Sequence, residues 1–509
     1  MLACGNGRRT AGVAGRDGGG GGMSDAPMQL LEALARHGRD VPGKIAVREV
    51  GGEGRGLRYA ELQERAERLA EGFRRSLPRG AVVMLCCGNV IEFPIALCGV
   101  LLAGCSVFPF SPDAARPELV RAAETSGAAA IIGVERVLEI LRERVPVRIP
   151  IDSLEDPAEG FAKVDAPAGG GAALLLQTSG TTGRPGVVRR SSRSVDAVGR
   201  NMVEAIDFAG TDVVLSTVPL CHSYGVEHGL LAPLLAGSTV NLCSTFNLAM
   251  VIEQLQSAGV TVFPGVPSIF EMIGRLVPSG ASFPTLRLAY SAGSVLPMPV
   301  SEMVQRRFNL RIGQVYGATE IGSVTFNDPH GRDFDPGSAG MPMRDVEIRT
   351  VTPGGAAALA GSEAQVEVSA PSMFDGYIGG DGSEISGGFF STGDVGRLSA
   401  SGKLTITGRM KLLIDVGGLK VNPTEVEQLL LEHPAVAECV VISVPLTETV
   451  NRLKALIIPR YEQQPPAAEE LARFARARLT AYKVPRVFEM RENFPRTPTG
   501  KVLRHLIEA

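Results

Sequence analysis

The sequence predicts an α/β protein with a large N-terminal domain of layered α/β subdomains, a small β-rich subdomain, and a small α+β C-terminal domain. Three observations support this prediction. Apolar strands alternate with helical segments until about residue 320. Short alternating strands and Gly-rich turns begin near Gly361, and a compact unit of strands and helices follows Arg409. The length of 509 residues also exceeds what one hydrophobic core usually supports.

The first part of the chain shows the alternation expected of parallel sheets covered by helices. Apolar residues recur at helical spacing over residues 59–77. The predicted strands are 81–86, 106–110, 128–134, 213–218, 239–242 and 260–263. The stretch 93–110 is almost wholly apolar, but two prolines and two glycines interrupt it. It therefore predicts a buried helix leading into a strand, and not a membrane span.

The last part of the chain predicts the two smaller units. Strands are expected at 365–369, 396–398 and 404–407, and then at 439–444 and 452–459, with helices at 423–432 and 468–481. The domain boundary falls near residues 409–411. We therefore expect an N-terminal domain over 23–409 and a C-terminal domain over 410–509. Residues 1–22 are rich in Gly and Arg and lack the apolar core of a signal peptide, which predicts a disordered leader.

Composition excludes several classes of protein. A net charge of -3 gives no broad basic surface for nucleic acid. The eight cysteines form no Cys-x-x-Cys pair and most lie in apolar runs, so they predict buried thiols in a reducing, cytoplasmic location. Six histidines without a His/Cys cluster give no support for a transition-metal site.

A loop of hydroxyl groups and glycines follows the apolar strand that contains Leu174. The loop residues are Thr178, Ser179, Gly180, Thr181, Thr182 and Gly183. Glycines bring backbone N–H groups close to an anion, and hydroxyl groups add donors, so such a loop suits a triphosphate. It lacks the lysine of a Walker motif. Taken alone, the loop also fits an ordinary turn.

Two further polar clusters have the chemistry of a nucleotide site. After the strand that ends near residue 315, the aromatic ring of Tyr316 can stack on a purine, the Thr319 hydroxyl can reach a phosphate, and the Glu320 carboxylate can hold Mg²⁺. In the segment 391–394, Asp394 follows a tight turn and can accept from both ribose hydroxyls. Each cluster by itself also fits an ordinary turn.

The C-terminal region adds two loops whose residues could take part in a reaction. Gly417 and Gly418 form one, and a Pro/Gly turn presenting Lys501 forms the other. When a carboxylate attacks an α-phosphate, two negative charges approach each other. A lysine between them offsets the repulsion most strongly in the transition state, and removal of such a group costs roughly 3–4 kcal/mol, or about 10²–10³ in rate.

With these motifs in this order, the chain resembles the superfamily of acyl-CoA synthetases, peptide-synthetase adenylation domains and luciferases. The resemblance runs from about residue 30 to the C-terminus. The ending Pro498-Thr-Gly-Lys-Val-Leu-Arg504 is most similar to acyl-CoA and aryl-CoA ligases. The resemblance implies a mobile C-terminal domain and an ATP-dependent acid–thiol ligase that uses ATP, Mg²⁺ and coenzyme A. A small carboxylic acid would become an acyl-adenylate and then a CoA thioester.

The resemblance also implies a role for each motif. The loop after Leu174 would hold the phosphates, Thr319 and Glu320 would serve phosphate and Mg²⁺, and Lys501 would act in adenylation. The adenine would be lined by Gly293, Ser294, Val295, Gln314, Tyr316 and Gly317. The ribose would be held by Asp394 and Arg409, Lys411 would be the hinge, and Gly417 and Gly418 would line the pantetheine path. The acyl pocket would be bordered by His222, Tyr224, Gly225, Val266 and Ala292, although a structural role fits His222 equally well.

One motif departs from the family pattern. The family's phosphate loop continues Gly-x-Pro-Lys-Gly-Val, whereas this chain reads Gly183-Arg184-Pro185-Gly186. The usual lysine is missing, and a histidine downstream is replaced by serine. Loss of one charge-assisted contact costs about 1.5–3 kcal/mol. Arg184, Arg189 or Arg190 could compensate, although a helix expected after the loop would direct the last two elsewhere.

This departure leaves several functions open. The chain is an ordinary two-step ligase with impaired adenylation, or it thioesterifies an acyl-adenylate made by a partner enzyme. A stand-alone adenylation enzyme that loads a carrier protein is a third possibility. A luciferase-like oxygenase and a non-catalytic binding protein are more distant alternatives. The apolar and small residues of the predicted pocket suggest a bulky hydrophobic, alicyclic or aromatic acid.

Overall fold

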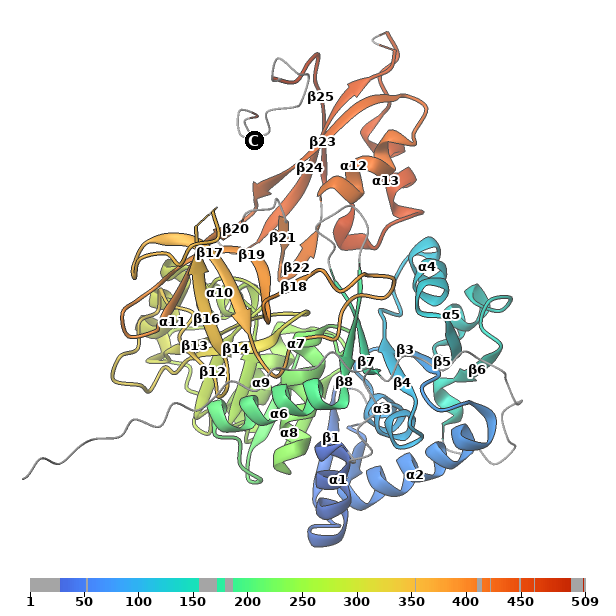
Figure 1. Cartoon of the computed structure of the whole chain (residues 1–509), viewed down its shortest axis with the longest axis vertical. Helices are drawn as coiled ribbons and strands as arrows, with labels where there is room; N and C mark the ends of the chain where they lie inside the picture. Colours follow the sequence, from blue (N-terminus) through green and yellow to red (C-terminus); the bar gives the residue numbers. More distant parts are fainter. Residues whose placement is uncertain are drawn as a thin grey trace, which may run out of the picture.

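The computed structural model describes residues 28–51, 54–154, 172–178, 186–352, 354–409, 414–421, 423–447, 450–461, 463–495 and 507. The predicted leader lies outside these ranges, as do Lys411, predicted to be the hinge, and Lys501, predicted to act in adenylation. Figure 1 shows a body built on three sheets, with the C-terminal unit, orange to red, beside it. This arrangement is the mixed α/β fold that the sequence predicts.

The first layer is a six-stranded sheet in the order β6-β5-β3-β4-β7-β8. Its strands are β3 (Val82–Cys86), β4 (Ser106–Pro109), β5 (Ala128–Gly133), β6 (Val147–Pro150), β7 (Ala172–Gln177) and β8 (Val187–Ser191). The associated helices are α2 (Tyr59–Ser76), α3 (Glu92–Leu102), α4 (Arg116–Ser126), α5 (Glu135–Ile140) and the short η1 (Ile151–Ser153). A Cβ on Gly99 of α3 would lie 3.0 Å from the Ala66 carbonyl oxygen of α2, so glycine permits the close packing of these helices.

The second layer is a nine-stranded sheet in the order β15-β14-β13-β12-β11-β9-β10-β1-β2, parallel from β1 to β13. Its strands are β1 (Ile45–Val50), β2 (Gly56–Arg58), β9 (Val213–Ser216), β10 (Thr239–Cys243), β11 (Val262–Gly265), β12 (Leu288–Ser291), β13 (Ile312–Ala318), β14 (Gly322–Asn327) and β15 (Met341–Pro342). The helices of this region are α1 (Gln29–Asp40), α6 (Ser192–Ile206), α7 (Ser223–Val226), the π-helix η2 (Glu227–Leu231), α8 (Ala232–Ala236), α9 (Leu248–Ser257), α10 (Pro267–Leu276) and α11 (Met298–Phe308).

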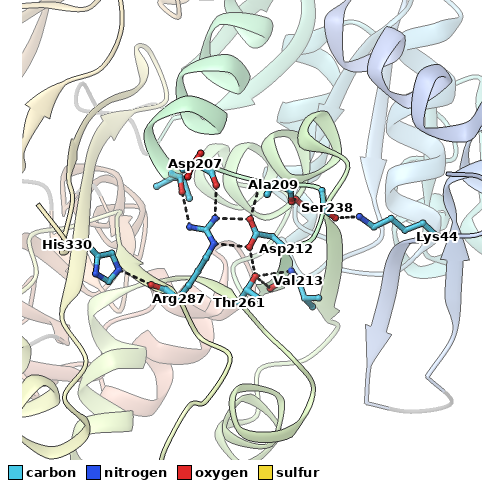
Figure 2. A network of polar contacts seen from close by, with 11 residues as sticks. Lys44, Asp207, Ala209, Asp212, Val213, Ser238, Thr261, Arg287 and His330 are labelled. Atoms are coloured by element: carbon cyan, nitrogen blue, oxygen red, sulfur yellow. Dashed lines mark hydrogen bonds and ion pairs between the residues drawn. The ribbon is translucent and has the colours of Figure 1, made fainter. Parts of the chain in front are cut away.

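A polar network around the buried Asp212 holds the amino ends of β9, β11 and β12 together (Figure 2). Asp212, which precedes β9, accepts from the Arg287 guanidinium at 2.8 and 2.7 Å and from the Thr261 hydroxyl at 2.7 Å. Arg287 precedes β12 and Thr261 precedes β11. One carboxylate therefore fixes three strands at one edge of the sheet, and the predicted site residues lie at the opposite, carboxyl edge.

The third layer is a five-stranded antiparallel sheet. Its strands are β16 (Glu347–Val351), β17 (Glu363–Ser369), β18 (Ile385–Ser386), β19 (Phe389–Leu398) and β20 (Leu404–Arg409). The expected tight turn at 391–394 is wrong, because these residues belong to the continuous strand β19. Gly393 has φ +73 and the register with β17 shifts there, so a glycine bulge takes the place of a turn.

The C-terminal unit combines a hairpin with a three-stranded sheet. Its strands are β21 (Ile414–Val416), β22 (Leu419–Val421), β23 (Val436–Pro445), β24 (Asn451–Pro459) and β25 (Val487–Met490), with helices α12 (Pro423–Leu431) and α13 (Ala468–Arg476). The helix predicted to reach residue 481 ends earlier, at Arg476, and a separate 3₁₀ turn η3 (Ala481–Lys483) follows. After this turn the chain continues into β25, which pairs with β24.

The cysteines and the helices of the described residues bear on two expectations from the sequence. The seven cysteines in the described ranges are free thiols, and six of them are buried. Across the same ranges, no helix has the length and apolar character that would allow it to cross a membrane. Burial also raises the pKa of Cys98 to about 12, which keeps that thiol protonated at neutral pH.

Candidate active site

The base of the predicted phosphate loop is a closed hairpin between β7 and β8. Thr178 donates its backbone N–H to the Gly186 carbonyl oxygen at 2.8 Å, and its hydroxyl accepts from the Gly186 N–H at 3.1 Å. The intervening residues 179–185 lie outside the described part of the chain. The expectation of a helix directly after the loop is wrong. The antiparallel strand β8 follows it, because Val187 and Val188 are buried against the sheet.

The turn after β13 carries Thr319 and Glu320 and is held by three neighbours. The Arg190 guanidinium donates to the Thr319 carbonyl oxygen at 3.0 Å. The Phe374 N–H donates to the Glu320 carbonyl oxygen at 2.8 Å, and the Tyr377 hydroxyl donates to Glu320 Oε1 at 2.8 Å. The two residues predicted to serve phosphate and Mg²⁺ therefore lie on one restrained turn.

Tyr377 joins this turn to the base of the phosphate loop. A Cβ on Gly186 would lie 2.9 Å from the Tyr377 ring, so the loop base packs closely against that ring. The Ile378 N–H also donates to the Val187 carbonyl oxygen at 2.8 Å. Sequence reasoning missed Tyr377. The available signal in the sequence was the Gly376-Tyr377 pair, because a glycine often marks a sharp turn. In the structure, Gly376 has φ +109.

Glu320 has the chemistry needed for Mg²⁺ without a dedicated protein cage. Among the described residues there is no group of three or more His, Cys, Asp or Glu side chains that could hold a metal. Mg²⁺ usually takes one or two carboxylates and fills its other positions with phosphate oxygens and water. A single carboxylate on a restrained turn, at the end of a strand beside the phosphate loop, is compatible with that arrangement.

Tyr316 and Asp394 meet where two sheets come together. The Tyr316 hydroxyl, at the end of β13, donates to Asp394 Oδ2 in β19 at 2.8 Å. Asp394 is 2 % exposed, and its partner in the β19–β20 ladder is Arg409. The backbone therefore brings together the two residues predicted to hold a ribose. The Arg409 side chain lies outside what the structure describes.

The loop predicted to line adenine is anchored by Gln314. The Gln314 carbonyl oxygen accepts from the Leu296 N–H at 3.2 Å, and its amide nitrogen donates to the backbone of Pro336 and Ser338 at 2.6 and 3.1 Å. The Gln314 side chain is thus engaged by the backbone, which makes it a support for the loop 292–297. Val295 in this loop is 54 % exposed and presents its side chain outward.

The predicted acyl-pocket residues cluster around helix α7. The Tyr224 hydroxyl donates to the Gly265 carbonyl oxygen at 2.8 Å, and the Tyr224 ring contacts His228 edge-on at 4.6 Å. A Cβ on Gly225 would lie 2.1 Å from the Pro219 carbonyl oxygen, so only glycine fits there. Burial, aided by the positive charge of Lys483, lowers the pKa of His222 to about 4. His222 is therefore neutral at neutral pH.

Two buried hydroxyl groups lie beside the residues predicted for the acyl pocket. Ser216 and Thr217, at the end of β9, line a narrow space together with Tyr224 and Pro264. Neither hydroxyl has a hydrogen-bond partner among the described residues, and both residues are buried. Buried hydroxyls normally find partners, but the space that these two line is too narrow to admit a water molecule, so it leaves no room for a ligand group.

The C-terminal unit approaches the site through the hairpin β21–β22. Gly417 and Gly418 form its two-residue turn with φ of +65 and +87, the geometry of a type I′ turn that favours glycine. A Cβ on Gly418 would lie 3.3 Å from the Val266 side chain. A Cβ on Gly293 would lie 3.8 Å from the Gly418 carbonyl oxygen. The loop predicted for pantetheine therefore faces the loop predicted for adenine.

Comparison with known proteins identifies the family. A model described as AMP-binding enzyme matches residues 34–378, and a model described as AMP-binding enzyme C-terminal domain matches residues 425–501. The chain belongs to the AMP-binding enzyme family. Feruloyl-CoA synthase of Amycolatopsis sp is 30% identical over 92% of this chain and 96% of its own. 4-coumarate–CoA ligase 3 of Oryza sativa subsp. japonica is 28% identical over 90% of this chain and 88% of its own.

Solved structures of a CoA ligase and a CoA synthetase share the fold. A malonyl-CoA ligase in a ternary product complex with methylmalonyl-CoA and AMP superposes with a TM-score of 0.79 at 29% identity, covering 92% of this chain and 100% of that one. o-Succinylbenzoate CoA synthetase from Bacillus subtilis, at 24% identity, gives a TM-score of 0.83 over 94% and 98% of the two chains. The predicted superfamily and its acyl-CoA ligase branch are confirmed: the chain is an ATP-dependent acid–thiol ligase that uses a carboxylic acid and coenzyme A.

Proposed function

We propose that this ligase converts its acid into a CoA thioester in two steps, through an acyl-adenylate bound between Tyr316, Asp394 and the Thr319–Glu320 turn. One observation supports the proposal most strongly. The Gly417–Gly418 turn lies against Val266 and the Gly293 loop, beside the predicted nucleotide site. A glycine turn in that position leaves a path along which a thiol can reach an adenylate.

In the first step, a carboxylate oxygen of the acid attacks the α-phosphorus of ATP and pyrophosphate leaves. Thr178 and the Thr319 turn would bind the phosphates, and Asp394 would orient the ribose. Mg²⁺ held by Glu320 would neutralise phosphate charge when bound. Lys501, outside the described residues, would bridge the carboxylate and the α-phosphate. In the second step, the thiolate of CoA attacks the carbonyl carbon and AMP leaves.

The absence of the usual lysine from the phosphate loop supports impaired adenylation. Arg190 is 0 % exposed and is engaged by Thr319, Ser194 and Glu227, so it does not replace the missing loop lysine. Arg189 donates to the Asp375 carbonyl oxygen at 3.3 Å. Of the three arginines considered from the sequence, the structure thus excludes Arg190 as a substitute. The first step would then be slower than the second, although both belong to one enzyme.

A panel of acids tests the function directly. The full-length protein, with ATP, Mg²⁺ and CoA, would be given hydroxylated and unsubstituted aromatic acids and short dicarboxylic acids, with products identified by mass spectrometry. We expect one acid class to give a CoA thioester with equimolar AMP. No thioester from any acid would remove the proposed function.

The half-reactions separate the alternatives. Pyrophosphate exchange reports adenylation, and CoA thioester from a synthetic acyl-adenylate reports the second step. Slow exchange with fast thioester formation supports impaired adenylation. No exchange at all would favour an adenylate supplied by a partner enzyme, and transfer to a pantetheinylated carrier in preference to CoA would favour carrier loading. Lys501→Ala should lower exchange by about 10²–10³ while leaving thioester formation nearly unchanged.

A further inference from the structure

We propose that Glu118 and Lys483 form a clamp between the two parts of the ligase that holds the C-terminal unit in the orientation for thioester formation. The proposal rests on the two-step function above. Glu118 belongs to helix α4 of the six-stranded layer, and Lys483 ends the 3₁₀ turn η3 of the C-terminal unit. Neither residue belongs to the motifs that suggested the function, so the clamp is a separate feature.

The clamp is made of buried charges in good geometry. Lys483 Nζ lies 2.9 Å from Glu118 Oε1 and 3.1 Å from Glu425 Oε1. The three side chains are 6 %, 3 % and 8 % exposed. The Thr480 hydroxyl also donates to Glu118 Oε2. The backbone N–H of Ala115 donates to the same oxygen at 3.1 Å, which orients the carboxylate from within its own helix.

The arrangement allows the clamp to open without leaving an unpaired ammonium. Buried charges are stable only when paired, and loss of a sole partner is strongly unfavourable. Lys483 is paired with Glu425 of helix α12 as well as with Glu118. When the C-terminal unit turns away, Lys483 can keep its ion pair with Glu425, and Glu118 becomes exposed to water. The contact therefore favours one orientation but does not lock it permanently.

Two other contacts define the same orientation. The Thr447 hydroxyl donates to Glu271 Oε2 of helix α10 at 2.7 Å, and Gly418 lies against Val266. Together with Lys483, these contacts come from three different segments of the C-terminal unit. The positive charge of Lys483 also acts on His222 at the acyl pocket, so the clamp lies close to the reaction site. Residues that hold this orientation are positioning residues for the step in which Gly417 and Gly418 face the adenylate.

The test compares the two half-reactions in Glu118→Gln. Glutamine keeps the acceptor that binds the Ala115 N–H and removes the charge that pairs with Lys483. The first probe is synthetic feruloyl-adenylate with CoA in single turnover, followed by the adenylate of whichever acid the panel selects. We expect thioester formation to fall about tenfold or more, as for loss of a charge-assisted contact, with pyrophosphate exchange changed less than twofold. The matched control is Glu124→Gln on the same helix. Glu124 pairs with Arg144 at the surface, so this substitution should change neither half-reaction.

The outcomes separate the clamp from the function on which it rests. Equal rates for Glu118→Gln and wild type in both half-reactions, or an equal fall in both, would overturn the clamp alone. Wild type that forms no thioester would overturn the proposed function first. Thermal denaturation checks folding of each variant. If Glu118→Gln fails to fold, Thr480→Val removes the neighbouring hydrogen bond and is expected to show the same selective loss.

Discussion

The Tyr316 hydroxyl donates a hydrogen bond to the Asp394 carboxylate at 2.8 Å, across 78 residues of sequence. This bond joins the carboxyl end of β13 in the nine-stranded sheet to the bulge of β19 in the five-stranded sheet. It holds a 2 % exposed carboxylate in one place before any nucleotide arrives. A preorganised acceptor of this kind is what recognition of a ribose diol requires.

The first prediction concerns Asp394. In Asp394→Asn, the acceptor for ribose hydroxyls is weakened, and the hydrogen bond from Tyr316 becomes a neutral one. Loss of a charge-assisted bond costs about 1.5–3 kcal/mol. We expect KM for ATP to rise by about tenfold or more, and the preference for ATP over 2′-deoxy-ATP to shrink. An unchanged preference would exclude Asp394 from ribose binding. Steady-state kinetics with both nucleotides provides the measurement.

The second prediction concerns the bond between Tyr377 and Glu320. Tyr377→Phe removes the donor at 2.8 Å from Glu320 Oε1 but keeps the ring that packs against Phe374. Glu320 then loses orientation toward Mg²⁺. Adenylation should fall about tenfold at low Mg²⁺ and recover in part at high Mg²⁺. Tyr461→Phe, at an exposed tyrosine, is the control. A loss that is independent of Mg²⁺ concentration would contradict the assignment.

The third prediction concerns the buried ion pair of Arg190 and Glu227. Arg190 Nη1 lies 3.3 Å from Glu227 Oε1, and the two side chains are 0 % and 4 % exposed. Removing one partner leaves an uncompensated charge, so Glu227→Gln should lower the free energy of unfolding by about 3–5 kcal/mol. The double variant Arg190→Met with Glu227→Leu should regain most of that loss. Urea unfolding measures both, and a stable single variant would refute the pair's structural role.

The fourth prediction concerns pH and His228. His228 bonds to the Tyr290 hydroxyl and the Ser323 hydroxyl, and burial lowers its pKa from 6.5 to about 3. In the unfolded chain, His228 takes up a proton as the pH falls through about 6.5, whereas in the folded chain it stays neutral. The contribution of the neutral His228 to the free energy of unfolding is therefore complete above pH 6.5. It is lost as the pH falls toward 3. Between pH 7 and 5 the loss is about 2 kcal/mol.

The variant His228→Asn isolates this contribution. Urea unfolding of wild type and variant at pH 7 and pH 5 gives the two differences in free energy. Wild type should lose about 2 kcal/mol more than the variant over this range. Equal losses in the two proteins would show that His228 takes up its proton in the folded state as readily as in the unfolded chain.

Periodic segments made most of the fold predictable. The apolar spacing of residues 59–77 and the apolar run of 93–110 correspond to α2, α3 and β4, because burial of one face or of a whole segment leaves a pattern in the sequence. The motif around Tyr316 was predictable for a related reason, since polar residues directly after apolar strands gather at one sheet edge. The bulge at Gly393 was not, because a glycine with φ +73 fits a turn and a bulge equally well.

Partners far apart in the chain could not be predicted. Glu118 and Lys483 are 365 residues apart, and each alone is consistent with an ordinary charged surface. Arg190 next to the phosphate loop suggested a phosphate contact, whereas its guanidinium is fully buried beneath Thr319. Gln314 likewise bonds to the backbone. In each case, burial and not residue type sets the role, and burial follows from tertiary packing.

A crystal structure with a non-hydrolysable acyl-sulfamoyl adenosine and CoA is the measurement that tests the central claim most directly. The proposed site predicts the adenine beside Tyr316 and the Gly293 loop, with ribose hydroxyls within hydrogen-bond distance of Asp394. It also predicts the CoA thiol entering past Gly417 and Gly418. An adenosine bound away from Thr319 and Asp394, or a thiol approaching from another side of the molecule, would contradict the account.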